Sequence, residues 1–406
     1  MARLKYWLWL TTRKGVDSAA ALTVLDHFLT PEQAYYADPE EFDLLPLSPA
    51  ARRGLADRSL DRAEAILADC ERLGLRIMTI QDGDYPERLR QIADPPAVLY
   101  IRGRVFHFDE EAAIGVVGAR IPSEYGKWCA SRFGLELARG GALVVSGIAE
   151  GLDTLAVQGA LKGGGPVASV LAGGVDVPFP PENRYLYEDV AAAGALISEY
   201  PPGSLHKGYR FPRRNRILSG LCLGVLAVEC LPHSGTMSTV AHALEQDRDV
   251  FAVPNAIDAP MSEGTNRLIQ QGAKLVTCGQ DILEEYWSRF PQKLAASAPL
   301  TPEAAQARLE SLKQERSAAA AAVRQEQPEP SGREMVPRAV QRERFTDDQL
   351  AILFALAEGK RNADELVELT QIPARRVLSA LTMLQVDGAV QEHPGRRFSS
   401  LVELEK

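Results

Sequence analysis

The chain has 406 residues, of which 46% are hydrophobic and 24% charged, and its formal net charge is −9. This composition is ordinary for a globular protein, and the length predicts two or three domains. The negative charge argues against a protein that wraps duplex DNA over its whole surface, but it is compatible with a local basic cleft.

The cysteines and the apolar runs indicate the compartment. Five cysteines are scattered without a CxxC pair, so neither a zinc site nor a disulfide framework is indicated. The longest apolar run, at residues 217–231, is too short to cross a bilayer and contains Glu229. The run at residues 6–10 is too short for the apolar region of a secretory signal. We therefore expect a cytoplasmic protein.

Residues 1–80 have the pattern of short helices separated by breakers. Leu25 and Phe28 keep helical spacing, Pro31 begins the next turn, and another helix is predicted at residues 61–73. The pattern fits a helix-hairpin-helix or sterile-alpha-motif module. It fits a plain helical packing or dimerisation domain about as well.

Between residues 81 and 290, short aliphatic runs alternate with helical patterns. Strands are predicted at 114–117, 143–145, 167–171, 195–198, 225–228, 250–253 and 274–277. Each run is apolar throughout, which is typical of strands buried on both faces of a parallel sheet. The sequence therefore predicts an α/β domain with a doubly wound, Rossmann-like sheet that binds ligands at the carboxyl ends of its strands.

The C-terminal part divides into a linker and a compact module. Residues 291–344 are rich in Ala, Gln, Glu, Arg and Pro and predict a linker. Residues 345–402 have the pattern of a winged-helix domain, with Arg375 and Arg396 at the two places where winged helices contact DNA. Because residues 345–401 hold eight Asp/Glu against six Lys/Arg, contact with a protein fits this module as well as contact with DNA.

A basic segment stands out in this acidic chain. From His206 to Arg216 there are five Lys/Arg and no acid, and Tyr209 and Phe211 place aromatic rings among them. Single-stranded nucleic acid is bound by cations that contact phosphates and by aromatic faces on which bases stack. Taken alone, the segment fits a solvated surface loop of an enzyme equally well.

Three predicted strand ends lead into turns of small residues, at 118–126, 146–153 and 233–236. In each turn, backbone N–H groups and a hydroxyl lie at the expected N-terminus of a helix, where anions bind. Three such turns on one edge of a sheet, with the basic segment nearby, favour a phosphate-binding edge. A dinucleotide cofactor and a P-loop are disfavoured, because neither GxGxxG nor GxxxxGK[ST] occurs.

Candidate catalytic groups are few. His233 and Ser234 are neighbours in sequence, which rarely lets a base activate a serine. Four carboxylates lie near strand ends without a spacing that marks a catalytic pair, and we expect structural roles for them: Asp153, Asp176, Glu199 and Glu229.

In sequence order, these motifs resemble the DNA-processing protein A (DprA/Smf) family. The resemblance covers about residues 84–285. The matching stretches are YPERL at 85–89, DPPAVLY at 94–100, VVGAR at 116–120, GLDT at 151–154, FPRRNRI at 211–217 and GTNRLI at 264–269. The last two are together highly specific, and the flanking helical and winged-helix modules fit longer members of the family.

The resemblance implies an extended Rossmann domain, without catalysis, cofactor or metal, that binds single-stranded DNA. It also implies that the protein protects incoming DNA, promotes loading of the RecA recombinase in natural transformation or recombination, and forms a homodimer. By motif position, DNA contacts are expected at Arg120, Ser146, Gly147, Phe211, Arg214, Asn215 and Arg216, with Ser234, Gly235 and Thr236 lining the pocket. Charge and position add Lys207 and Arg213.

The chain departs from the family pattern in several places. Glu150 stands where the family usually has a basic residue, residues 155–157 replace Ala-Ala-His, residues 234–239 replace SGSLIT, and Asn255 replaces a glycine. Glu150 predicts weaker DNA affinity or a different ligand. The rival interpretation is a nucleotide-binding Rossmann enzyme of the nucleoside-monophosphate phosphoribohydrolase type, whose PGGxGTxxE loop residues 233–238 do not match.

Overall fold

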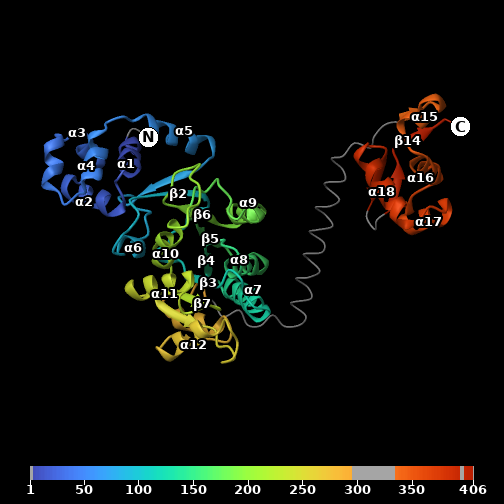
Figure 1. The fold of residues 1–406 in the computed structure, drawn as a ribbon. Coiled ribbons are helices and arrows are strands. Elements are labelled where there is room, and N and C mark those ends of the chain that lie inside the picture. Colours follow the sequence, from blue (N-terminus) through green and yellow to red (C-terminus); the bar gives the residue numbers. More distant parts are fainter. Residues whose placement is uncertain (1–2, 295–333, 394–396, 406) are drawn as a thin grey trace. The chain divides into compact units, whose positions relative to one another are not determined.

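The computed structural model of the protein describes residues 3–294, 334–393 and 397–405 (Figure 1). The chain divides into two compact units, residues 1–299 and residues 300–406. Most of the predicted linker, residues 295–333, and the predicted hairpin tip at 394–396, with Arg396, lie outside the described residues. Within the described ranges, every helix is too short or too polar to span a membrane.

The first unit begins with a bundle of short helices. They are α1 (Leu4–Thr12), α2 (Ser18–Phe28), α3 (Pro31–Tyr36), η1 (Pro39–Leu44), α4 (Pro49–Ala56) and α5 (Asp61–Arg72). The side chains of Asp17, Thr30 and Ser48 accept backbone N–H groups at the starts of α2, α3 and α4. The apolar core of the bundle also includes Val98 and Tyr100 of the sheet, so the bundle and the sheet edge share one core.

A nine-stranded sheet forms the centre of this unit, in the order β1-β2-β6-β5-β4-β3-β7-β8-β9. The strands are β1 (Arg76–Thr79), β2 (Val98–Gly103), β3 (Ala113–Val117), β4 (Leu143–Ser146), β5 (Val167–Val170), β6 (Ala195–Ser198), β7 (Gly224–Ala227), β8 (Asp249–Ala252) and β9 (Lys274–Leu275). Strands β3 to β9 pair in parallel, which confirms the predicted doubly wound sheet. Strands β1 and β2 extend it in antiparallel pairing.

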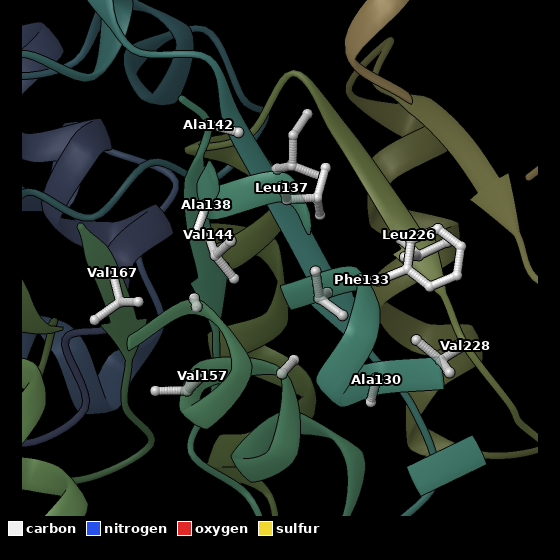
Figure 2. Close-up of a cluster of buried hydrophobic side chains, with 14 of the residues drawn as sticks. Ala130, Phe133, Leu137, Ala138, Ala142, Val144, Val157, Val167, Leu226 and Val228 are labelled. Carbon is white, nitrogen blue, oxygen red and sulfur yellow. The ribbon is translucent and has the colours of Figure 1, made fainter. Parts of the chain in front are cut away.

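Helices cover both faces of the sheet (Figure 1). One face packs against α7 (Glu124–Arg139), α8 (Leu152–Gly163) and α9 (Arg184–Ala193), and the other against α10 (Arg210–Gly220), α11 (Gly235–Glu245) and α12 (Glu263–Gln270). Figure 2 shows the first of these cores around Phe133, Leu137 and Val157, with Val144 and Leu226 contributed by the sheet. Strands buried on both faces explain why their sequences are apolar throughout.

Shorter elements complete the unit. They are α6 (Glu87–Arg90), η2 (Phe108–Glu110), η3 (Pro181–Asn183), α13 (Gln280–Leu283) and η4 (Glu284–Tyr286). Helices α7 and α8 touch through their backbones, because a Cβ at Gly134 would lie 2.1 Å from the carbonyl oxygen of Ala156 and one at Gly159 would lie 2.2 Å from that of Ser131. This close packing fixes the N-termini of both helices at the carboxyl edge of the sheet.

The topology opens a crevice between β3 and β7. Strand β3 continues through α7 on one face, whereas its neighbour β7 continues through α11 on the other face. Adjacent connections that leave toward opposite faces leave space between them at the carboxyl ends of the strands, and open α/β sheets bind ligands there. The loops after β3 and β7 are therefore where a site is expected.

The second unit has the winged-helix arrangement that the sequence predicts. Its elements are β10 (Glu334–Val336), α15 (Arg338–Arg344), α16 (Asp347–Ala357), β11 (Arg361–Asn362), α17 (Ala363–Thr370), α18 (Ala374–Val386), β12 (Val390–His393), β13 (Arg397–Ser400) and β14 (Val402–Leu404). Its own core centres on Leu353, Leu366 and Leu381.

The start of this unit differs from the sequence-based interpretation. Residues 334–344, assigned from composition to the linker, form β10 and α15. Strand β10 pairs with β14, and buried Gln341 donates to the carbonyl oxygens of Val336 and Glu405. These long-range contacts hold a polar segment that composition alone assigns to a linker.

Candidate nucleic-acid interface

A cavity of about 610 Å³ lies at the carboxyl ends of β3 and β7. Its walls come from the loop after β3, the start of α8, the start of α10, and the loop that leads from β7 into α11. Seven of the predicted DNA-contact residues line it: Arg120, Phe211, Arg214, Asn215, Ser234, Gly235 and Thr236. Five do not line it: Ser146, Gly147, Lys207, Arg213 and Arg216.

Arg214 forms part of the cavity wall, but the residue as a whole is only 4% exposed. Its Nη1 donates to the carbonyl oxygens of Gly147, at 3.2 Å, and Val170. Its Nε donates to the Asn215 side-chain oxygen at 3.1 Å, and the amide nitrogen of Asn215 donates to the carbonyl of Gly235. These bonds join α10 to the residue that follows β4, to β5 and to α11, so Arg214 and Asn215 hold the walls of the cavity together.

The charge partner of Arg214 is Asp153, at the start of α8 and 6% exposed. Burial raises the pKa of Asp153 to about 6, although the Arg214 charge and backbone N–H groups of Gly118 and Gly147 oppose the shift. Burial also lowers the pKa of Arg214. Much of the positive charge expected from this motif is therefore directed at a carboxylate of the protein itself.

Arg216 is part of a buried ion-pair network. Its side chain is 6% exposed, and it lies 2.9 Å from the Asp94 carboxylate and 2.8 Å from the Glu199 carboxylate. Burial alone would lower its pKa, but the two carboxylates raise it. Arg216 and Arg213 both donate to the Ser18 hydroxyl of α2. The structure thus gives Arg216 protein partners that fasten α10 to the N-terminal bundle.

Ser146 and Gly147 are also enclosed by protein. Ser146 is fully buried, and its hydroxyl donates to the Val116 carbonyl at 2.7 Å. A Cβ on Gly147 would lie 2.5 Å from the Arg214 guanidinium and 2.7 Å from an Asp153 oxygen. Gly147 thus allows the Arg214–Asp153 pair to approach the backbone. Ser146 and Gly147 therefore lie behind the cavity wall and support it.

Exposed cations lie at the cavity and in the basic segment. Arg120 is exposed, and its guanidinium carbon lies 5.0 Å from the centre of the Phe211 ring. Lys207 is exposed as well. Arg210, which was not among the predicted contacts, stacks on the Tyr200 ring at 4.1 Å. Neither arginine forms an ion pair with a carboxylate in the part of the chain that the structure describes.

Phe211 belongs to an aromatic cluster that the sequence analysis missed. Phe179 stacks on His206 with ring centres 4.9 Å apart and planes inclined by 21°, and Phe211 lies 5.6 Å from Phe179. Phe179 remains 39% exposed. Partly exposed rings beside cations are the elements on which bases of a single strand stack. The sequence around Phe179 contains no motif that predicts this contact, because Phe179 and Phe211 are distant in sequence and only the fold brings them together.

Carboxylates of the protein occupy two of the three predicted anion-binding turns. At the first helix, α7, the buried Glu229 accepts the backbone N–H and the hydroxyl of Ser123, at 2.9 and 2.6 Å. At the second turn, Asp153 receives the N–H groups of Gly118 and Gly147. The third turn, at the start of α11, lines the cavity and has no such carboxylate among the described residues. Its first N–H groups have no partner within the helix.

The remaining carboxylates have structural partners too. Asp176 accepts the N–H of Gly203 at 2.9 Å, and Glu199 pairs with Arg216. Glu150, the acidic residue that stands where the family usually has a basic one, lies outside the main cavity. It lines a second cavity of about 290 Å³ with Thr154, Glu182 and Asn183.

Comparison with known proteins gives a consistent answer. The family model for DNA recombination-mediator protein A matches residues 76–287, just over half of the chain, and the DprA winged helix domain matches residues 326–396. DNA processing protein DprA of Bacillus subtilis is 37% identical over 243 residues, 60% of this chain and 82% of that protein. Protein Smf of Synechocystis is 29% identical over 406 residues, 97% of this chain and 98% of that protein.

A solved structure agrees in fold. DNA processing protein A from Streptococcus pneumoniae superposes with a TM-score of 0.59 at 31% identity, over 69% of this chain and 97% of that one. The residues that the family model matches include β3 and β7, whose carboxyl ends form the cavity. With the motifs, the sheet and the winged helix in agreement, the chain belongs to the DNA-processing protein A (DprA/Smf) family.

Proposed function

We propose that the protein binds single-stranded DNA along the cavity between β3 and β7, without catalysis, and delivers the strand to the RecA recombinase. The observation that carries this proposal is that Arg120, Phe211 and the start of α11 line one crevice, with Phe179 and His206 in ring contact with Phe211. Cations and helix N–H groups hold phosphates, and the rings accept bases without regard to sequence.

The composition of the cavity supports binding over catalysis. Among the described residues that line it, the titratable side chains are Arg120, Asp153 and Arg214. Asp153 interacts with Arg214, so the cavity lacks a free carboxylate pair or a nucleophile beside a base. This arrangement disfavours the rival interpretation, a phosphoribohydrolase. Incubation with nucleoside monophosphates, followed by a search for released base, tests that point.

Membership of the family supports the finer parts of the proposal. Relatives are named DNA processing proteins, which agrees with protection of incoming DNA and with delivery to RecA during transformation or recombination. Homodimerisation is part of the same proposal. The expected results are faster coating of a single strand by RecA in the presence of the protein, and a dimer mass in solution.

Binding is tested by titrating single-stranded and duplex oligonucleotides over a series of salt concentrations. We expect the protein to prefer the single strand, because the cavity and the aromatic rings beside it do not present a helix that could read a groove of duplex DNA. The logarithm of the binding constant should fall by roughly 0.7 per neutralised phosphate for each unit of log salt. A flat salt response, or equal affinity for duplex, would contradict the proposal.

A further inference from the structure

The N-terminus of α7 is the position where nucleotide-binding Rossmann folds hold a phosphate. It follows β3, the first parallel strand, and faces the switch point beside β7. In such folds the phosphate contacts the free N–H groups of this helix, and glycine allows the close approach. In this protein the place is taken by the carboxylate of Glu229, which follows β7.

The contacts of Glu229 are those of a bound anion. One carboxylate oxygen accepts the backbone N–H of Ser123 and the other accepts its hydroxyl, and the Asn255 amide lies 3.4 Å away. Glu229 is 1% exposed. A Cβ on Gly126, in the first turn of α7, would lie 2.3 Å from a Glu229 oxygen. Because Gly126 has no side chain, the Glu229 carboxylate can approach the backbone as closely as a bound phosphate would.

The charge of Glu229 is held by hydrogen bonds and by the helix terminus. No Lys or Arg forms an ion pair with it in the described part of the chain, although such pairs stabilise Glu111 and Glu199. A helix N-terminus favours one negative charge, and a second anion at the same place meets the first at short range. Glu229 therefore fills the site both by volume and by charge.

We propose that Glu229 is a specificity-determining residue that excludes the phosphate of free nucleotides from the α7 terminus. The inference rests on the proposed function, since it explains how a Rossmann fold binds a DNA strand in a cell rich in nucleotides. Of the two helix termini, a mononucleotide phosphate is left with that of α11. A strand offers several phosphates and bases at once, so it contacts the α11 terminus, Arg120 and the Phe179–Phe211 rings together, and these added contacts make it the preferred ligand.

The test uses the full chain with Glu229→Ala and, as a matched control, Glu111→Ala. Glu111 is another buried carboxylate, but it pairs with Lys293 and lies away from the α7 terminus. Binding of inorganic phosphate and of adenosine monophosphate is measured by calorimetry at constant ionic strength. We expect affinity to rise about tenfold or more in Glu229→Ala, the equivalent of a regained charge-assisted contact, and not in Glu111→Ala.

A folded Glu229→Ala protein without this gain, or an equal gain in Glu111→Ala, overturns the inference. If Glu229→Ala does not fold in chloride, recovery of its circular dichroism in phosphate at equal ionic strength supports the inference, and equal failure in both salts overturns it. Neither readout involves DNA. Failure of the wild-type protein to bind a single strand would therefore overturn the proposed function without deciding the outcome of the Glu229 test.

Discussion

The basic segment and its surroundings contain two kinds of cation that differ in burial. Arg214 and Arg216, inside the family motif, are 4% and 5% exposed and are bound to carbonyls and carboxylates of the protein. Arg120 and Lys207, less distinctive in sequence, are exposed. The comparison shows that the most recognisable part of the motif builds the crevice, and we expect phosphate contact at the exposed cations beside it.

The sharpest test of this division is Arg216→Ala. Removing the guanidinium takes the close cation from Asp94 and from Glu199, whose side chain is 9% exposed. Breaking a buried ion pair costs about 3–5 kcal/mol, so the free energy of unfolding in urea should fall by that amount. Arg213→Ala is the control, because its side chain is 34% exposed and lies 3.9 Å or more from the same carboxylates. It should cost below about 1 kcal/mol. Equal losses would contradict the division.

A second test concerns Arg214 and not Arg216, because it follows the titration of Asp153, the charge partner of Arg214. The pKa of Asp153 is raised from 3.8 to about 6, so the folded state holds this proton more tightly than the unfolded state. Its contribution to stability is full below pH 3.8 and is lost as the pH rises through 6. Asp153→Asn does not titrate, so its unfolding free energy relative to the wild type should rise by up to roughly 3 kcal/mol between pH 4 and 7.

The control for this pH series is Asp109→Asn. Burial would raise the pKa of Asp109, but backbone N–H groups of Glu87 and Arg88 and the charge of Arg88 lower it. Its stabilising contribution is therefore present above pH 3.8 and is lost as the pH falls through the lowered value. Between pH 4 and 7, urea unfolding at each pH should show a nearly constant free-energy difference between Asp109→Asn and the wild type, whereas the difference for Asp153→Asn rises. Parallel slopes would show that Asp153 is not the titrating group.

The exposed half of the comparison is tested by Arg120→Ala. Loss of a charge-assisted phosphate contact should weaken single-strand binding by about 1.5–3 kcal/mol, roughly ten- to a hundredfold, with no change in the melting temperature. Arg104→Ala is the matched control, since Arg104 is also exposed and lies 4.9 Å from a phenylalanine ring, that of Phe106, but does not line the cavity. Equal weakening by both variants would mean that the phosphate path lies elsewhere.

Sequence reasoning reached the parallel sheet because strands buried on both faces have an unmistakable apolar pattern. It did not reach β1 and β2, because these short strands pair antiparallel at the edge and are buried by the N-terminal bundle. The same limit applies to the site. The sequence motifs identified seven residues that line the cavity, but not the pairing of Arg216 with Asp94, which is 122 residues away. Phe179 likewise meets Phe211 only through the fold.

The smallest effect is expected from removing the winged-helix unit. A chain that ends at Leu294 keeps every residue that lines the cavity and all three cores of the first unit. In the winged helix, Arg376 at the start of α18 is already bound to Asp348 at 2.8 and 2.7 Å, which leaves the exposed Arg375 beside it. An exposed cation of this kind contributes below about 1 kcal/mol, so single-strand affinity should fall by less than about fivefold. Arg375→Ala in the full chain should reduce single-strand affinity no more than the truncation does.

The contrary outcome is a truncated chain that melts at the same temperature as the first unit of the intact protein and yet no longer binds single-stranded DNA. The winged helix would then contribute to the site, and the division between buried and exposed cations would no longer account for binding.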